Sequence, residues 1–163
     1  MAVLSVMGRL YMKPAADCPF RNVDRTLQQI PSEVKIIVVD VHAEATSEKV
    51  ALGWYLDGRA SVVFGTHTHI PTADERILPN GTAYITDLGM TGPYDSVLGR
   101  RKDRVIRHLM TNLPNPFDVA EGDVRLCGIL TSVDSATGRA THIERVCVSA
   151  ANYVPMAQGA DSD

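Results

Sequence analysis

Residues 34–41 read VKIIVVDV, and this stretch decides the fold. A run that is this long, apolar and rich in β-branched residues predicts a strand buried on both faces of a sheet. We expect a helix over 46–57 after it, ended by Asp57-Gly58, and then a second buried strand over 60–64. A strand, a helix and a strand within about thirty residues form a βαβ unit. The sequence therefore predicts that the chain begins as a parallel sheet.

The segments around this unit predict a mixed α/β chain. A loop is expected over 13–22, followed by a helix over 23–30 for which Asn22 provides the N-cap. Residues 77–85 hold Asn-Gly between two extended pieces, which is a strong turn signal. The other expected elements are strands over 3–6, 117–119, 124–133 and 140–148, a loop over 86–99, a helix over 102–113, and turns at 121–122 and 137–138. The fold class is α/β, with parallel strands first and antiparallel strands last.

The composition is that of one soluble globular domain. The 163 residues include 16 Lys plus Arg and 19 Asp plus Glu, so the net charge of −3 gives no strong attraction to nucleic acid or to a membrane. No run approaches the ~20 apolar residues of a membrane-spanning helix, and the amino terminus lacks the pattern of a signal peptide. We expect one domain over 1–150 and a flexible, acidic tail over 151–163.

Three scattered cysteines, Cys18, Cys127 and Cys147, form no CxxC pair. A cysteine zinc site is therefore not expected. Reduced, buried thiols in a cytoplasmic protein are the better interpretation.

Histidines follow the two buried strands at the points where those strands end. His42 comes directly after the strand 34–41, and His67 and His69 follow the strand 60–64. The carboxyl ends of neighbouring parallel strands meet at one edge of a sheet, where ligands bind. Imidazole is a common ligand of zinc, iron and manganese, so the three side chains are candidate metal ligands. The alternative is that they are ordinary hydrogen-bonded surface histidines.

Carboxylates near these histidines are candidates to support them. Metal-bound imidazoles usually donate their second N–H to a carboxylate or carbonyl oxygen, and Asp40, Glu44 and Asp74 are close enough in sequence to accept it. The alternative is that Glu44 only approaches the helix start and that Asp74, like Asp87, only forms a turn. Other catalytic signatures are absent: the sequence has no GxSxG elbow, no P-loop and no GxGxxG.

Three segments together resemble a known family. They are DVHAEATSEK at 40–49, GTHTH at 65–69 and TDLGMTGP at 86–93. In combination they are similar to a bacterial family of calcineurin-like metallophosphoesterases, whose characterised activity is 2′,3′-cyclic-nucleotide 2′-phosphodiesterase. The resemblance runs from about residue 8 to about residue 145, which is nearly the whole chain.

The resemblance implies a four-layer α/β/β/α sandwich with a dinuclear metal centre. Two divalent ions (iron, manganese or zinc) would clamp the phosphate of a small phosphodiester substrate and activate the attacking water. By resemblance, His42 and His67 would bind one ion and His69 the other.

The chain also departs from that family. Its members carry an additional first half with Gly-Asp, Asn-Gly-Glu-Asn and Gly-Asn-His motifs, which supply the remaining ligands and the general-acid histidine. None of these motifs occurs here, so we expect this chain to be the carboxyl-terminal half, to bind one metal or none by itself, and to lack a general acid of its own. An exposed sheet edge would favour a homo-oligomer or pairing with an amino-terminal half. The alternative function is a non-catalytic folded subunit that associates with a partner chain.

Overall fold

The computed structural model describes residues 1–13 and 17–152, and these fall into two compact units. Unit 1 contains residues 1–90 and 127–146, and unit 2 contains residues 91–126 and, among the described residues, 147–152. Most of the expected tail over 151–163 lies outside the described residues.

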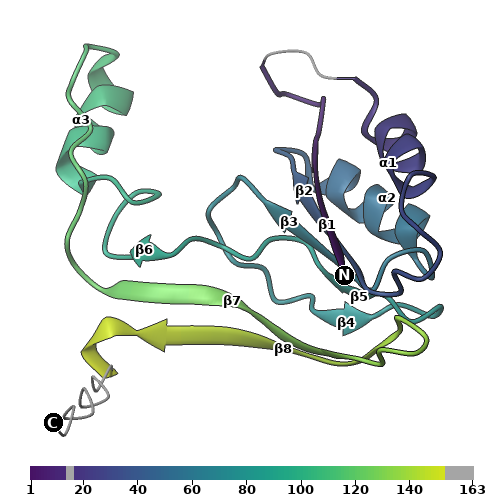
Figure 1. Ribbon diagram of the computed structural model, residues 1–163. Coiled ribbons are helices and arrows are strands. Elements are labelled where there is room, and N and C mark those ends of the chain that lie inside the picture. The colour runs from purple at the N-terminus through teal and green to yellow at the C-terminus, as the bar shows by residue number, and fades with distance from the viewer. Residues whose placement is uncertain (14–16, 153–163) are drawn as a thin grey trace, which may run out of the picture. The chain divides into compact units, whose positions relative to one another are not determined.

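Unit 1 is built on a five-stranded sheet with the order β1-β2-β3-β5-β4 (Figure 1). Its strands are β1 (Ala2–Met7), β2 (Ile37–His42), β3 (Val62–Thr66), β4 (Arg76–Ile77) and β5 (Ala83–Ile85). The pairs β1–β2, β2–β3 and β3–β5 are parallel, and β4 pairs with β5 in antiparallel fashion. The predicted βαβ unit is confirmed, because helix α2 (Thr46–Leu56) connects β2 to β3.

Helices α1 (Pro19–Leu27) and α2 cover one face of this sheet (Figure 1). Val39, Val41 and Val63 of the sheet are buried in the core formed with these helices. The expected loop over 13–22 is wrong at its end, because α1 already begins at Pro19 and its N-cap is Cys18 rather than Asn22. Proline is favoured at the first position of a helix, where its fixed φ suits the helix and its missing N–H costs nothing.

The other face of the sheet is covered by a hairpin of β7 (Val124–Val133) and β8 (Ala140–Ser149). Val62 and Phe64 alternate with Val63 along β3, so they point to this second face, where they pack with Ala140 and Ile129. The helices, the parallel sheet and the hairpin therefore form three layers within unit 1. The predicted turn at 137–138 is confirmed, with Gly138 at a φ of +74°.

Unit 2 contains helix α3 (Lys102–Thr111), the short strand β6 (Gly92–Pro93) and a short 3-10 helix, Ala150–Asn152. The predicted strand over 117–119 is wrong, because Val119 forms only an isolated bridge with Arg100. Strand β6 pairs with the start of β7, although it lies in the segment predicted as a loop. The prediction missed this strand because two residues are too few to show a hydrophobic pattern. Across the described residues, no helix is long and apolar enough to cross a membrane.

The cysteines match their predicted burial only in part. All three are thiols, with Cys18 and Cys127 half-buried and Cys147 exposed. The expectation that Cys147 is a buried apolar residue is therefore wrong.

Candidate metal centre

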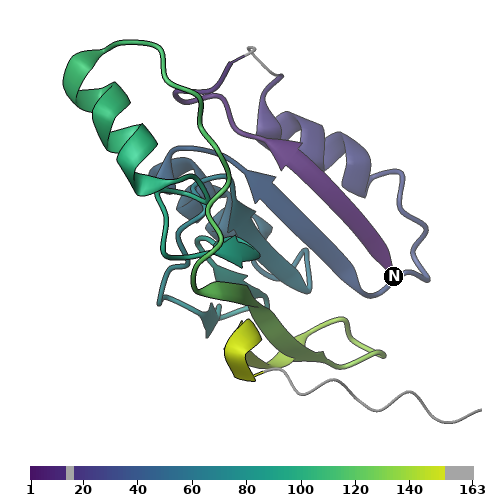
Figure 2. The same cartoon turned by 90° about the vertical axis from the view of Figure 1, so that its left-hand side faces the viewer.

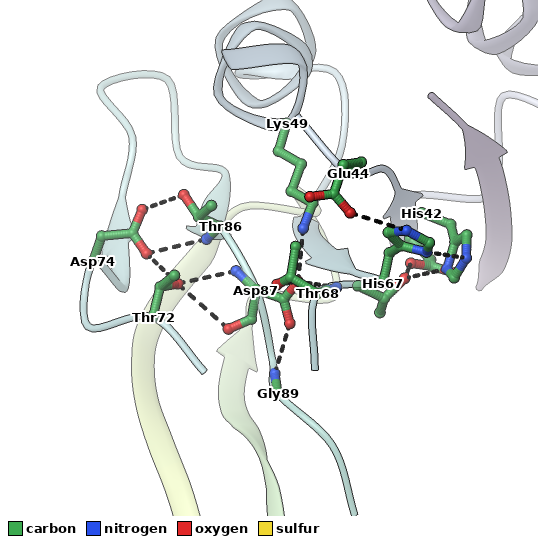
Figure 3. Close-up of polar contacts among 12 residues, drawn as sticks. His42, Glu44, Lys49, His67, Thr68, Thr72, Asp74, Thr86, Asp87 and Gly89 are labelled. Carbon is green, nitrogen blue, oxygen red and sulfur yellow. Dashed lines mark hydrogen bonds and ion pairs between the residues drawn. The ribbon is translucent and has the colours of Figure 1, made fainter. Parts of the chain in front are cut away.

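The carboxyl ends of β2 and β3 bring two of the three predicted histidines together (Figure 3). His42 is the last residue of β2 and pairs in register with Thr66, the residue before His67. His42 Nε2 lies 3.1 Å from His67 Nδ1, and the two rings meet edge to face with centroids 4.8 Å apart. The parallel register thus turns two strand-end imidazoles toward each other.

The partners of these rings determine which nitrogens carry protons. Thr66 Oγ1 donates its proton to Asp40 at 2.7 Å, so it can only accept from His42 Nδ1, which lies 2.9 Å away. A carboxylate oxygen of Glu44 lies 3.2 Å from His67 Nε2, and this contact is favourable only with a proton on that nitrogen. With these partners satisfied, each ring can direct a lone pair toward the other ring, and this arrangement suits a metal ion bound between the two nitrogens.

The spacing of this nitrogen pair suits a metal ion. Two nitrogen ligands at about 2.0–2.1 Å from one ion, at angles of about 90–110°, are roughly 2.9–3.4 Å apart, and the observed 3.1 Å lies within this range. In the described part of the chain, however, no three His, Cys, Asp or Glu side chains are grouped so that they could hold a metal by themselves. The residues present therefore fit part of a metal site.

His69 lies apart from the facing pair. It is exposed, and no hydrogen bond or ring contact joins it to His42 or His67 among the residues described. His67 and His69 both have a left-handed backbone, with φ of 96° and 66°. Such angles are strained for a residue with a side chain and persist only where neighbouring contacts enforce them.

The three candidate carboxylates have different roles. Asp40 reaches His42 through Thr66, and Glu44 contacts His67 directly, so both support the imidazole pair. Asp74 instead accepts hydrogen bonds from Thr72 and from the backbone and hydroxyl of Thr86. Burial by itself would raise the pKa of Asp74, but these hydrogen bonds outweigh it and hold the pKa below its ordinary value. Asp74 therefore ties the chain at Thr72 to the end of β5 and does not reach the histidines.

A buried ion pair beside the histidines was not predicted from the sequence. Lys49 Nζ of α2 lies 2.6 Å from Asp87 Oδ2, and both side chains are only 1% exposed. The signal that could have found it is the helix pattern, because Lys49 lies three and seven residues before the buried Leu52 and Leu56 and so shares their face. A charged residue on the apolar face of a helix requires a buried partner of opposite charge.

Gly65 allows this pair to form. A Cβ atom at position 65 would lie 1.7 Å from the carbonyl oxygen of Thr86 and 2.7 Å from Cδ of Lys49. Only glycine leaves space for β3, the chain after β5 and the Lys49 side chain to meet there.

Comparison with known protein families identifies the family of this chain. It matches the family described as YmdB-like protein over residues 1–146. The chain belongs to the YmdB-like family. The resemblance noted in the sequence is thereby confirmed, because a 2′,3′-cyclic-nucleotide 2′-phosphodiesterase of Bacillus subtilis (strain 168) is 51% identical over 149 residues.

Two solved structures share the fold of this YmdB-like chain. One is a hypothetical protein from Thermus thermophilus, with a TM-score of 0.83 and 44% identity, and the match covers 90% of this chain and 56% of that one. The other is a phosphatase from Mycoplasma pneumoniae, with a TM-score of 0.83 and 34% identity, covering 90% of this chain and 52% of that one. The Bacillus subtilis match covers 91% of this chain and 56% of its relative, so the YmdB-like chain spans about half the length of these proteins.

Proposed function

We propose that this chain is the histidine-bearing part of a metal-dependent phosphodiesterase that hydrolyses cyclic nucleotides or similar small phosphodiesters. The observation that carries the proposal is the pair of facing ring nitrogens, His42 Nε2 and His67 Nδ1, 3.1 Å apart. The names of the Bacillus subtilis phosphodiesterase and the Mycoplasma pneumoniae phosphatase support the reaction class.

His42 and His67 would hold one divalent ion, and His69 would contribute to a second. Iron, manganese and zinc all accept imidazole nitrogen. When bound, two such ions polarise the phosphate and make water nucleophilic at neutral pH. Asp40, acting through Thr66, orients His42, and Glu44 orients His67. These two carboxylates also supply negative charge beside the ligands.

This chain would provide only part of the site. Three imidazoles leave two ions short of ligands, and none of the family motifs expected to supply a general acid occurs in the sequence. The remaining groups would come from further polypeptide that completes a four-layer sandwich, supplied either by an amino-terminal half or by association with another chain. The second candidate function is a subunit that associates with a partner chain without catalysing a reaction. Like the first, it would need a surface to which another chain can bind.

Strand β1 is the surface that favours such association (Figure 2). It lies at the edge of the sheet and pairs only with β2 among the described strands. The amides of Ala2 and Gly8 donate toward β2, to the carbonyls of Ile36 and His42, both at 2.9 Å. The backbone N–H groups of successive residues point to opposite edges of a strand. The amides at positions 3, 5 and 7 therefore point away from β2, where another strand can pair with them.

Metal binding by the purified chain tests the proposal. We expect the chain to bind one Zn²⁺, and we expect this binding to be lost in His67→Ala and retained in the control His142→Ala, whose side chain is 55% exposed in β8. Elemental analysis after dialysis gives the stoichiometry, and a chromogenic phosphodiester gives the hydrolysis rate. Unchanged metal content in His67→Ala contradicts the ligand assignment. Two ions per chain with rapid hydrolysis contradicts the incomplete site.

A further inference from the structure

We propose that Asp87 is a positioning residue for the histidine loop, defined as residues 67–69, and that it acts by holding Thr68. The proposal rests on the proposed function, because the position of this loop matters only if its imidazoles bind metal. Asp87 Oδ2 accepts a hydrogen bond from the Thr68 hydroxyl at 2.6 Å and another from the Thr68 backbone N–H at 3.2 Å. The residue between the two histidines is thus held at both its backbone and its side chain.

The histidine loop needs such a hold. His67 and His69 occupy left-handed backbone angles on either side of Thr68. Residues other than glycine populate this region sparsely, so an unrestrained segment would relax to other angles and separate His67 from His42 and Glu44. Asp87 contacts Thr68, which is bonded to both strained residues, so one pair of hydrogen bonds restrains His67 and His69 together.

Asp87 is itself rigidly held. Lys49 Nζ binds Oδ2 at 2.6 Å and the backbone N–H of Gly89 binds Oδ1 at 2.8 Å (Figure 3). Its backbone N–H donates to Thr72 Oγ1 at 3.0 Å, and its carbonyl accepts from the Thr72 N–H at 3.1 Å. Because Lys49 balances its charge in a buried site, Asp87 acts through Thr68 rather than as a charge facing the imidazoles.

Two threonine–aspartate pairs therefore flank His67. Thr66, before it, is tied to Asp40 in the neighbouring strand β2, and Thr68, after it, is tied to Asp87 beyond β5 on the opposite side. The first pair also touches His42, so it acts on a ligand directly. The second pair, Thr68 and Asp87, acts through Thr68, whose own atoms are not metal ligands. A substitution of Thr68 can therefore change the position of the loop without altering any metal-binding atom.

A matched set of variants of the full chain tests this role. Thr68→Val removes the hydroxyl that binds Asp87 and keeps a β-branched side chain, whereas Thr68→Ser keeps the hydroxyl. Thr26→Val makes the same change in α1, where the hydroxyl only donates a hydrogen bond to the backbone carbonyl of Asn22. The measurements are the affinity for Zn²⁺ alone, by competition with a chromogenic chelator, and the hydrogen exchange rate of the residue 68 amide in the metal-free chain.

We expect Thr68→Val to weaken Zn²⁺ binding about 10- to 100-fold, which is typical when a group behind a metal ligand is lost, and to speed exchange at residue 68. Thr68→Ser and Thr26→Val should match the wild type in both measurements. If Thr68→Val does not fold, Thr68→Ala makes the same deletion with less bulk.

The two measurements separate this inference from the proposed function. If the wild-type chain binds no Zn²⁺, the proposed function fails, and the exchange rates alone decide whether Asp87 holds the loop. Unchanged affinity and exchange in Thr68→Val overturn the inference. An equal loss of affinity in Thr68→Ser or Thr26→Val also overturns it, because the loss would then not depend on the hydroxyl that binds Asp87.

Discussion

The substitution Lys49→Met tests the buried ion pair that supports the histidine loop. The methionine can fill the space of the lysine stem but leaves the Asp87 carboxylate, which is 1% exposed, without its cation. Removing one partner of a buried pair costs about 3–5 kcal/mol of the free energy of unfolding. Asp87 keeps its hydrogen bonds from Thr68 and Gly89, so we expect a loss at the lower end, about 3 kcal/mol. A domain is stable by only about 5–15 kcal/mol, so this is a large fraction.

Urea unfolding followed by circular dichroism measures this loss. With a slope of about 1–3 kcal/mol/M, the midpoint should fall by roughly 1–3 M. Lys102→Met is the matched control, because Lys102 pairs with Asp95 on the surface and both side chains are more than half exposed. Exposed pairs contribute about 0–1 kcal/mol, so the control should barely shift. A midpoint for Lys49→Met equal to that of Lys102→Met would refute the reasoning.

Three other perturbations follow from the packing. Gly65→Ala places a methyl group 1.7 Å from the carbonyl oxygen of Thr86 and should cost about 3 kcal/mol or more, so thermal melting close to that of the wild type would contradict this close approach. Burial raises the pKa of Tyr84 from 10.0 to about 12, so the unfolded chain loses this proton first as the pH rises. Stability should therefore fall between those pH values, and Tyr84→Phe should flatten that part of a pH series of urea titrations. Val3→Lys charges an edge-strand residue that is 65% exposed and should weaken self-association in light scattering; a wild-type chain that stays monomeric at every concentration would disprove the edge contact.

The parallel half of the fold could be predicted because its signals are local. The strand before His42, helix α2 and the strand before His67 each show a hydrophobic pattern over many residues, and the Asn80-Gly81 turn correctly separates β4 from β5. The sequence places the start of helix α1 too late because two prolines, Pro14 and Pro19, precede residue 23, and proline is also typical of a loop. Local signals fail where an element is short, as in β6, or where a helix opens with proline, as in α1.

The candidate site could be predicted where the parallel topology brings strand ends together, as for His42 and His67, and where neighbours in sequence are neighbours in space. Asp40 and Glu44 flank His42 along the chain and do support the imidazole pair. Asp74 is five residues from His69, yet its carboxylate accepts hydrogen bonds from Thr72 and Thr86 and does not contact the histidine. Lys49 and Asp87 are 38 residues apart, and their pairing depends on how the helix sits on the sheet, which no local pattern specifies.

The unit that carries the histidines is discontinuous along the chain. Its last layer, residues 127–146, follows an excursion of 36 residues through unit 2. During synthesis, Val62 and Phe64 therefore emerge long before the hairpin that shields them, and their sheet face stays uncovered until residues 127–146 have been made. A nascent chain stalled before β8 would expose this apolar sheet face to solvent, and such transiently exposed surfaces are the ones that chaperones protect from aggregation.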